Sequence, residues 1–324
     1  MHMGNELLSP QVGGALLVLS GGALAYSARK TGTALNERVV PMMGVMGAFV
    51  FAAQMINFPV LAGTSGHLGG GTMLAILLGP HAAAIVMGSV LIVQCLIFQD
   101  GGLLALGANI LNLALIPAYT GYAVYRGIRL LLPSRRGAAT AAFVATLWSV
   151  VLGAVLVPVE VTIAGLYQVP VMLFVGLMAG VHLLIGLIEA GITVGVLGYI
   201  QRLRPDLLDW GTNGRVRISF RKFLAGIAVA TLLLAGGVSY FASSHPDGLE
   251  WVINEQLSLT GDDVNENAHD DGGMFDGYDV ADSQIREEHP MFSKGVAGAV
   301  GTVITVVVVM AAGSVVRRKK AQGN

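Results

Sequence analysis

Long apolar runs separated by short polar stretches dominate this chain. Most of the nine runs approach the roughly 20 residues that an α-helix needs to cross a bilayer. The run at 68–79 is shorter and ends at Pro80, which predicts a half-length or tilted helix after a Gly-rich loop. The pattern therefore predicts an all-α integral membrane protein with about nine membrane helices, over 9–27, 39–57, 68–79, 81–98, 103–131, 138–166, 171–201, 223–242 and 295–316.

Composition agrees with this pattern. Hydrophobic residues make up 54% of the chain and charged residues only 12%, against about 25% charged in a soluble domain. The 44 glycines suit helices that pack closely in lipid. The single cysteine, Cys95, lies in an apolar run, which excludes disulfides and cysteine-rich metal sites. A net charge of −1 gives no indication of a nucleic-acid partner.

Basic residues indicate the orientation. Of the 19 Lys and Arg, 17 fall in four clusters, which alternate threading of nine helices places on one side. The positive-inside rule makes that side the cytoplasm. We therefore expect a multi-pass protein of the inner (plasma) membrane, with the N-terminus, the loop 57–71 and the segment 243–294 outside and the C-terminus inside. The first apolar run has no basic residues before it, so no cleavable signal peptide is expected.

The external segment 243–294 divides the chain. It holds 13 of the 20 acidic residues but only two basic ones. Its middle, Gly261 to Gly277, is too polar to fold alone and predicts a mobile acidic loop. Together with the linker Pro205 to Lys222, it indicates a seven-helix module over 1–210 and a two-helix module over 220–324.

The first two residues, Met1 and His2, carry the most distinctive chemistry. A histidine beside a free amino terminus can chelate a metal through the α-amine, the intervening amide nitrogen and an imidazole nitrogen. His67, in the external loop, would supply a fourth nitrogen. Four nitrogens in a plane suit Ni(II), Cu(II) or low-spin Co(II). Because such ligands must lose protons, affinity should fall in acid. Asn57 or Ser65 could hydrogen-bond the second ring nitrogen of His67.

Ionisable residues within the apolar runs offer an alternative. His182 and Glu189 are seven apart and share one helix face, and Glu160 lies late in its run. A structural polar network is the favoured interpretation, but an ion-coupled secondary carrier using these three groups is the alternative. The sequence shows no convincing internal repeat, no His-Glu-x-x-His and no phosphate-binding loop, so no enzyme and no cofactor are expected.

Seven runs of the chain match a known family pattern: 51–59, 63–71, 76–80, 94–98, 100–103, 105–109 and 182–190. With these runs the chain resembles the CbiM/NikM family, the substrate-capture (S) components of energy-coupling-factor transporters for cobalt and nickel. The resemblance spans about residues 1–201, and Ser244 to Glu250 resembles the small N-type partner of these systems, here fused. The family commonly opens Met-His-Ile-Pro-Asp-Gly-Phe, whereas this chain keeps His2 and lacks the Pro-Asp-Gly turn.

The resemblance implies a metal held by the amine of Met1, the amide and imidazole of His2, and His67. It implies that the chain binds Ni(II) or Co(II) without hydrolysing nucleotide, in company with a transmembrane coupling (T) subunit and two ATPase subunits. In S components a stripe of small residues meets the coupling subunit. In this chain the stripe is formed by Gly44, Ala48 and Ala52. The alternative is that these residues only pack within the helix bundle.

Overall fold

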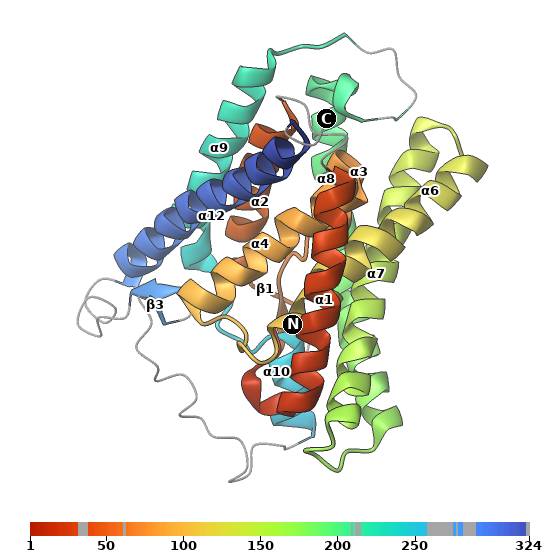
Figure 1. Ribbon diagram of the computed structural model, residues 1–324, viewed down its shortest axis with the longest axis vertical. Helices are drawn as coiled ribbons and strands as arrows, with labels where there is room; N and C mark the ends of the chain where they lie inside the picture. The colour runs from red at the N-terminus through yellow and green to blue at the C-terminus, as the bar shows by residue number, and fades with distance from the viewer. Residues whose placement is uncertain are drawn as a thin grey trace.

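The computed structural model describes residues 1–31, 38–60, 63–208, 210, 215–257, 275–276, 278–280 and 290–321. Each of the nine predicted apolar segments is helical, which confirms the all-α class (Figure 1). The main helices are α1 (Pro10–Thr31), α2 (Val39–Gln54), α3 (Gly71–Leu78), α4 (Pro80–Phe98), α6 (Tyr122–Leu131), α7 (Arg135–Ala164), α8 (Val171–Leu203), α9 (Phe220–Gly236) and α12 (Pro290–Ala321).

Five helices within the described residues are long and apolar enough to span a bilayer: α1, α4, α7, α8 and the part of α12 from Phe292 to Arg317. The apolar helix α2 has 16 residues. The helix α3 has eight, as its length in the sequence predicted, and it begins after Gly70, whose φ of 77° lies in the left-handed region that glycine tolerates. The nine predicted segments thus include five full-length spans and several shorter helices.

The segment 103–131 is helical from Leu106 onward and contains two stretches of wider, π-helical turns. It consists of α5 (Leu106–Asn109), the π-helical turns η2 (Ile110–Leu115) and η3 (Pro117–Gly121), and then α6. Pro117 has no backbone N–H, so regular α-helical bonding is interrupted there. The packing is close, because a Cβ added at Gly71 would lie 2.7 Å from the Cβ of Pro117. The wide turns therefore lie against the start of α3.

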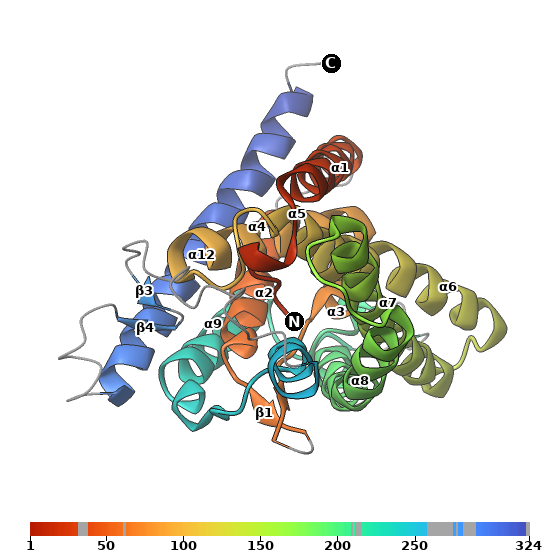
Figure 2. The ribbon, with the colours of Figure 1, turned by 90° about the horizontal axis from the view of Figure 1, so that it is seen from below.

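The second module covers one face of the first. Helices α9 and α12 pack on α2, as Figures 1 and 2 show. The stripe on α2 lies in this contact, where a Cβ at Gly44 would lie 3.2 Å from the sulfur of Met310 in α12. Ala48 and Ala52 are 2% and 0% exposed. Gly44 therefore packs against α12 of the chain's own second module, and a contact of the stripe with a coupling subunit stays a prediction.

A short hairpin joins α2 to α3. Its strands are β1 (Phe58–Pro59) and β2 (Ser65–Gly66), which pair antiparallel. The start of the acidic segment docks beside it, since the amide of Ser65 donates to the carbonyl of Pro246 at 2.8 Å and that of Ser243 donates to the carbonyl of Asn57 at 2.7 Å. A second hairpin pairs β3 (Phe275–Asp276) with β4 (Asp279–Val280). Most of the predicted acidic loop, 261–277, lies outside the described residues.

Candidate metal-binding site

The amino terminus is threaded into the middle of the helices (Figure 2). Met3 is 0% exposed, and its backbone makes two hydrogen bonds with Asn109, at the end of α5. Its amide donates to Oδ1 at 2.8 Å, and its carbonyl accepts from Nδ2 at 3.1 Å. A one-turn helix, η1 (Asn5–Leu7), then leads into α1. Burial of Met3 and satisfaction of its backbone therefore fix the first residues.

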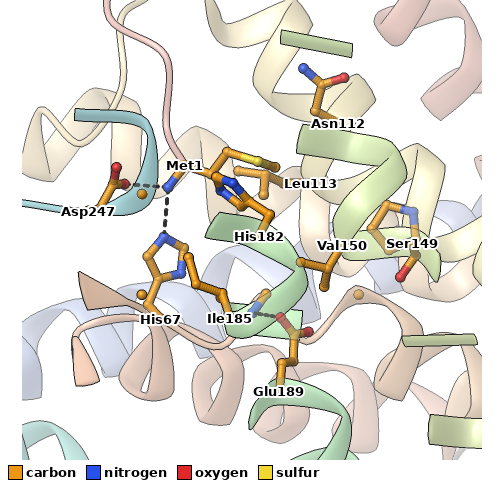
Figure 3. Close-up of a pocket in the computed structure, with 15 residues that line it drawn as sticks. Met1, His67, Asn112, Leu113, Ser149, Val150, His182, Ile185, Glu189 and Asp247 are labelled. Atoms are coloured by element: carbon orange, nitrogen blue, oxygen red, sulfur yellow. Dashed lines mark hydrogen bonds and ion pairs between the residues drawn. The ribbon is translucent and has the colours of Figure 1, made fainter. Parts of the chain in front are cut away.

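Nitrogen donors converge at this terminus. The amine of Met1 lies 3.1 Å from Nε2 of His67, although the two residues are 66 positions apart (Figure 3). The ring of His2 stacks on that of His67, with centroids 5.3 Å apart and an interplanar angle of 22°. The structure thus brings together Met1, His2 and His67, the three residues predicted as ligands.

Both imidazoles are held in their neutral form. Burial, reinforced by the positive amino terminus, lowers the pKa of His67 to about 3. Burial also lowers the pKa of His2, although Asp100 opposes the change. Nε2 of His2 is buried and makes no hydrogen bond to the described residues. A neutral imidazole has a free lone pair, which is the form that binds a transition metal.

Asp247, which the sequence analysis did not name as a site residue, contacts the amine. Its Oδ2 forms an ion pair with the amino group of Met1 (Figure 3). Burial alone would raise the pKa of Asp247, but the positive amino terminus holds it well below its usual range. The signal in the sequence was the run Ser244 to Glu250, which marked a family motif and gave no contact partner.

The same carboxylate organises its own loop. Oδ1 of Asp247 accepts from the amides of Leu249 at 2.8 Å and Glu250 at 3.0 Å, which caps α10 (Gly248–Glu250). Oε2 of Glu250 accepts from the amide of Asp247 at 3.0 Å and completes a capping box. The π-helical turn η6 (Trp251–Gln256) follows. Asp247 therefore uses one oxygen for the helix and the other for the amine.

The predicted partners of the His67 ring have other roles. Nδ1 of His67 lies 3.4 Å from the carbonyl oxygen of Leu68. The hydroxyl of Ser65 instead donates to the carbonyl of His245 at 2.7 Å, and Asn57 accepts from Ser243 through its backbone. The Ser65 hydroxyl and the Asn57 backbone thus tie the hairpin to the second module, and a role of either side chain in orienting the His67 ring stays a prediction.

A chain of side-chain hydrogen bonds runs from His2 to the His67 loop. Nδ1 of His2 lies 3.2 Å from Oδ1 of Asp100, and the other oxygen of Asp100 accepts from the hydroxyl of Tyr278 in the second module. Nε2 of Gln94 donates to that hydroxyl at 2.9 Å and to Gln54 at 2.8 Å. Gln54 in turn donates to the carbonyl of Gly69 at 3.0 Å. The network thus links the His2 ring to the backbone of the loop that carries His67.

Glu189 supports the His67 loop from α8. Its two carboxylate oxygens accept from the amides of Gly69 and Gly70, each at 2.9 Å. These amides open α3, where unpaired N–H groups and the helix dipole favour an anion. His182 and Glu160 have different partners, the carbonyl of Met178 at 2.9 Å and Nδ2 of Asn112 at 2.8 Å. The three residues of the secondary-carrier alternative are each engaged in a separate local contact.

A cavity of about 40 Å³ adjoins the nitrogen donors (Figure 3). A water molecule needs roughly 10–15 Å³ by this measure, so the space suits a few waters or a small ion. It extends from the amine toward α7 and α8. Its polar lining comes from Met1, His67, Asn112, Ser149, His182, Glu189 and Asp247.

Family comparison divides the chain in two. The family model described as "Cobalt uptake substrate-specific transmembrane region" matches residues 2–207. The "PDGLE domain" model matches residues 221–318. The second match includes Pro246 to Glu250. This segment carries Asp247, whose carboxylate contacts the amine of Met1.

Named relatives are transport proteins. The chain is 32% identical over 307 residues to a putative fused nickel transport protein NikMN of Archaeoglobus fulgidus, with 94% of this chain and 96% of the relative covered. It is 30% identical to a probable fused nickel transport protein LarMN of Lactiplantibacillus plantarum, over 72% of this chain and 74% of the relative. It is 34% identical to a cobalt transport protein CbiM of Geobacter sulfurreducens, over 67% and 65%.

A solved structure shares the architecture. The crystal structure of a transition metal transporter superposes with a TM-score of 0.55 and 32% identity, over 62% of this chain and 92% of that chain. The two family models, the full-length match and this superposition agree with one another. The chain therefore belongs to the CbiM/NikM family of cobalt-uptake substrate-specific transmembrane proteins, in the form fused to an N-type PDGLE module.

Proposed function

We propose that this chain is the substrate-binding membrane component of an energy-coupling-factor transporter that imports Ni(II) or Co(II). The observation that carries the proposal is the position of the Met1 amine, 3.1 Å from Nε2 of His67, with the His2 ring stacked beside it. The nickel and cobalt transport relatives support the same assignment.

The proposed ligands are the amine of Met1, the amide and imidazole of His2, and His67. Binding requires the Met1 amine to break its hydrogen bond to Asp247 and lose its proton, and the His2 amide to lose its proton as well. Nδ1 is the ring nitrogen that closes a six-membered chelate with that amide, so it must leave Asp100. The resulting plane of four nitrogens suits Ni(II) and low-spin Co(II) better than octahedral Mg(II) or tetrahedral Zn(II).

The proposed partners are a transmembrane coupling subunit and two ATPase subunits, which supply the energy. We place the chain in the plasma membrane with its N-terminus outside. The C-terminal ends of α1, α8 and α12 lie toward the top of Figure 1, and those of α1 and α8 carry basic residues. The amino terminus and α10 lie in the lower part of the figure, which supports this orientation. The site then faces the outside, where the ion is captured.

The pH dependence should reflect the amide of His2 rather than the imidazole of His67. His67, with a pKa of about 3, is neutral at pH 7 and has no proton to release. The His2 amide must release its proton when nickel binds, so affinity should fall as the pH is lowered from about 8 to about 6. Calorimetry in buffers of different ionisation enthalpy measures the proton count, and an affinity that is constant over this range contradicts the ligand set.

Uptake measurements test the transport assignment. In cells that express the chain together with its coupling and ATPase subunits, inactivating the ATPase should reduce nickel and cobalt accumulation to the background of cells without the chain. The matched control expresses the intact subunits at the same level. A secondary carrier takes its energy from an ion gradient. Accumulation that survives loss of the ATPase and disappears with the membrane potential would contradict the proposal.

A further inference from the structure

The acidic side chain at the site comes from the second module. Asp247 lies in the PDGLE region, yet its carboxylate is paired with the amine of Met1 and is only 13% exposed. Asp100, another carboxylate near the site, lies against the ring of His2, accepts from Tyr278 and is 21% exposed. Asp247 is therefore the carboxylate in direct contact with the positive charge of the empty site.

The ion pair places a carboxylate beside the amino group of Met1, where a divalent ion held by the proposed ligands would bring positive charge. A buried charge is costly unless an opposite charge accompanies it. The carboxylate of Asp247 is in position to meet this requirement both with the ion and without it.

The fold fixes this carboxylate rather than leaving it on a free loop. The hairpin holds the carbonyl of Pro246 through Ser65. Gly248 lies against α8, where a Cβ would be 2.9 Å from Cγ1 of Val181 and 3.0 Å from Cε1 of His182. Leu249 is 1% exposed. These three contacts, made by Pro246, Gly248 and Leu249, together hold the side chain of Asp247 against the amine of Met1.

We propose that Asp247 is the counter-charge of the captured ion, so that the second module completes the metal site of the first. This inference rests on the proposed function, because it assumes the terminal chelate. Asp247 acts here as a positioning and charge-compensating residue and is not itself a ligand.

The test is Asp247→Asn in the full chain, titrated with nickel chloride. Asparagine caps a helix as well as aspartate does, so the variant keeps the shape of α10 and loses the charge. We expect nickel to bind about 10- to 100-fold more weakly, the range typical for groups that support metal ligands. Glu255→Gln is the matched control, because Glu255 is exposed in η6 of the same module, and its affinity should stay within about twofold of wild type.

Three outcomes would contradict either the counter-charge role of Asp247 or the proposed function itself. Wild-type affinity in Asp247→Asn overturns the counter-charge while leaving the proposed function intact. A changed ligand-field absorption spectrum in nickel-loaded Asp247→Asn also overturns it, because Asp247 would then bind the metal directly. A wild-type chain that does not bind nickel overturns the proposed function itself. If Asp247→Asn does not fold, the pair Asp247→Glu and Asp247→Gln repeats the comparison, and the glutamate variant should bind more tightly.

Discussion

Adding two glycines in front of Met1 should abolish tight nickel binding without unfolding the protein. The extension converts the Met1 amine into an amide, which moves the positive charge away from Asp247 and breaks the chelate with His2. Two residues are needed, because a single one would make the histidine third in the chain and let the new amine, two amides and that imidazole chelate nickel on their own. Met1 is 8% exposed, so the added residues also have little room. Losing one of four nitrogen ligands should cost on the order of 100-fold or more in affinity. Calorimetry of the full-length chain measures this loss.

The control for this extension can be built into the same protein. A protease-removable extension that ends directly before Met1 gives one sample before and after cleavage, with an identical fold and identical detergent. Cleavage should restore nickel binding. A chain that binds nickel equally well in both states would refute the terminal chelate. Similar melting temperatures before cleavage and after it, measured without metal, would show that the extension acts on the site rather than on folding.

Replacing His67 with alanine should produce the second large effect. This side chain supplies the nitrogen that lies 3.1 Å from the amine, and it comes from a different part of the chain than the other three proposed ligands. Without it, water must complete the coordination, and affinity should again fall on the order of 100-fold. Nickel titration followed by absorption spectroscopy measures both the affinity and the changed ligand field.

His245→Ala is the matched control for His67→Ala. His245 is exposed on the docked segment of the second module, and its contact with Ser65 is made by the backbone carbonyl. Removing its imidazole should leave affinity within about twofold, as expected for an exposed side chain away from the ligands. Equal losses in the two variants would mean that nickel binds to imidazoles in general, and the assignment of His67 would fail.

The apolar pattern was sufficient to predict the helices and the place of the short one, because helix length and bilayer thickness constrain each other. It was not sufficient to predict the π-helical turns around Pro117. A proline within a long apolar run is compatible with a kink, a bulge or a regular helix in lipid, where neighbouring helices can satisfy the freed backbone groups. The wide turns lie in a tertiary contact, the close approach of Gly71 to Pro117, which the pattern does not contain.

The proposed metal ligands could be predicted from the sequence because their chemistry is distinctive. A histidine next to the amino terminus can chelate a metal, and this pointed to Met1 and His2, with His67 as the fourth nitrogen. Asp247 and Tyr278 were not predicted as site residues, since each lies more than 170 positions from its site partner and no periodicity links them. Gly44 shows the same limit. A small residue permits close packing with any helix, and the structure places α12 of this chain against it.

X-ray absorption spectroscopy of the nickel-loaded, full-length chain tests the central claim most directly. The terminal chelate predicts four nitrogen ligands in one plane around the nickel, with the sulfur of Met1 outside the first coordination shell. An octahedral shell of six oxygens, or a nickel–sulfur distance typical of a bond, would contradict it.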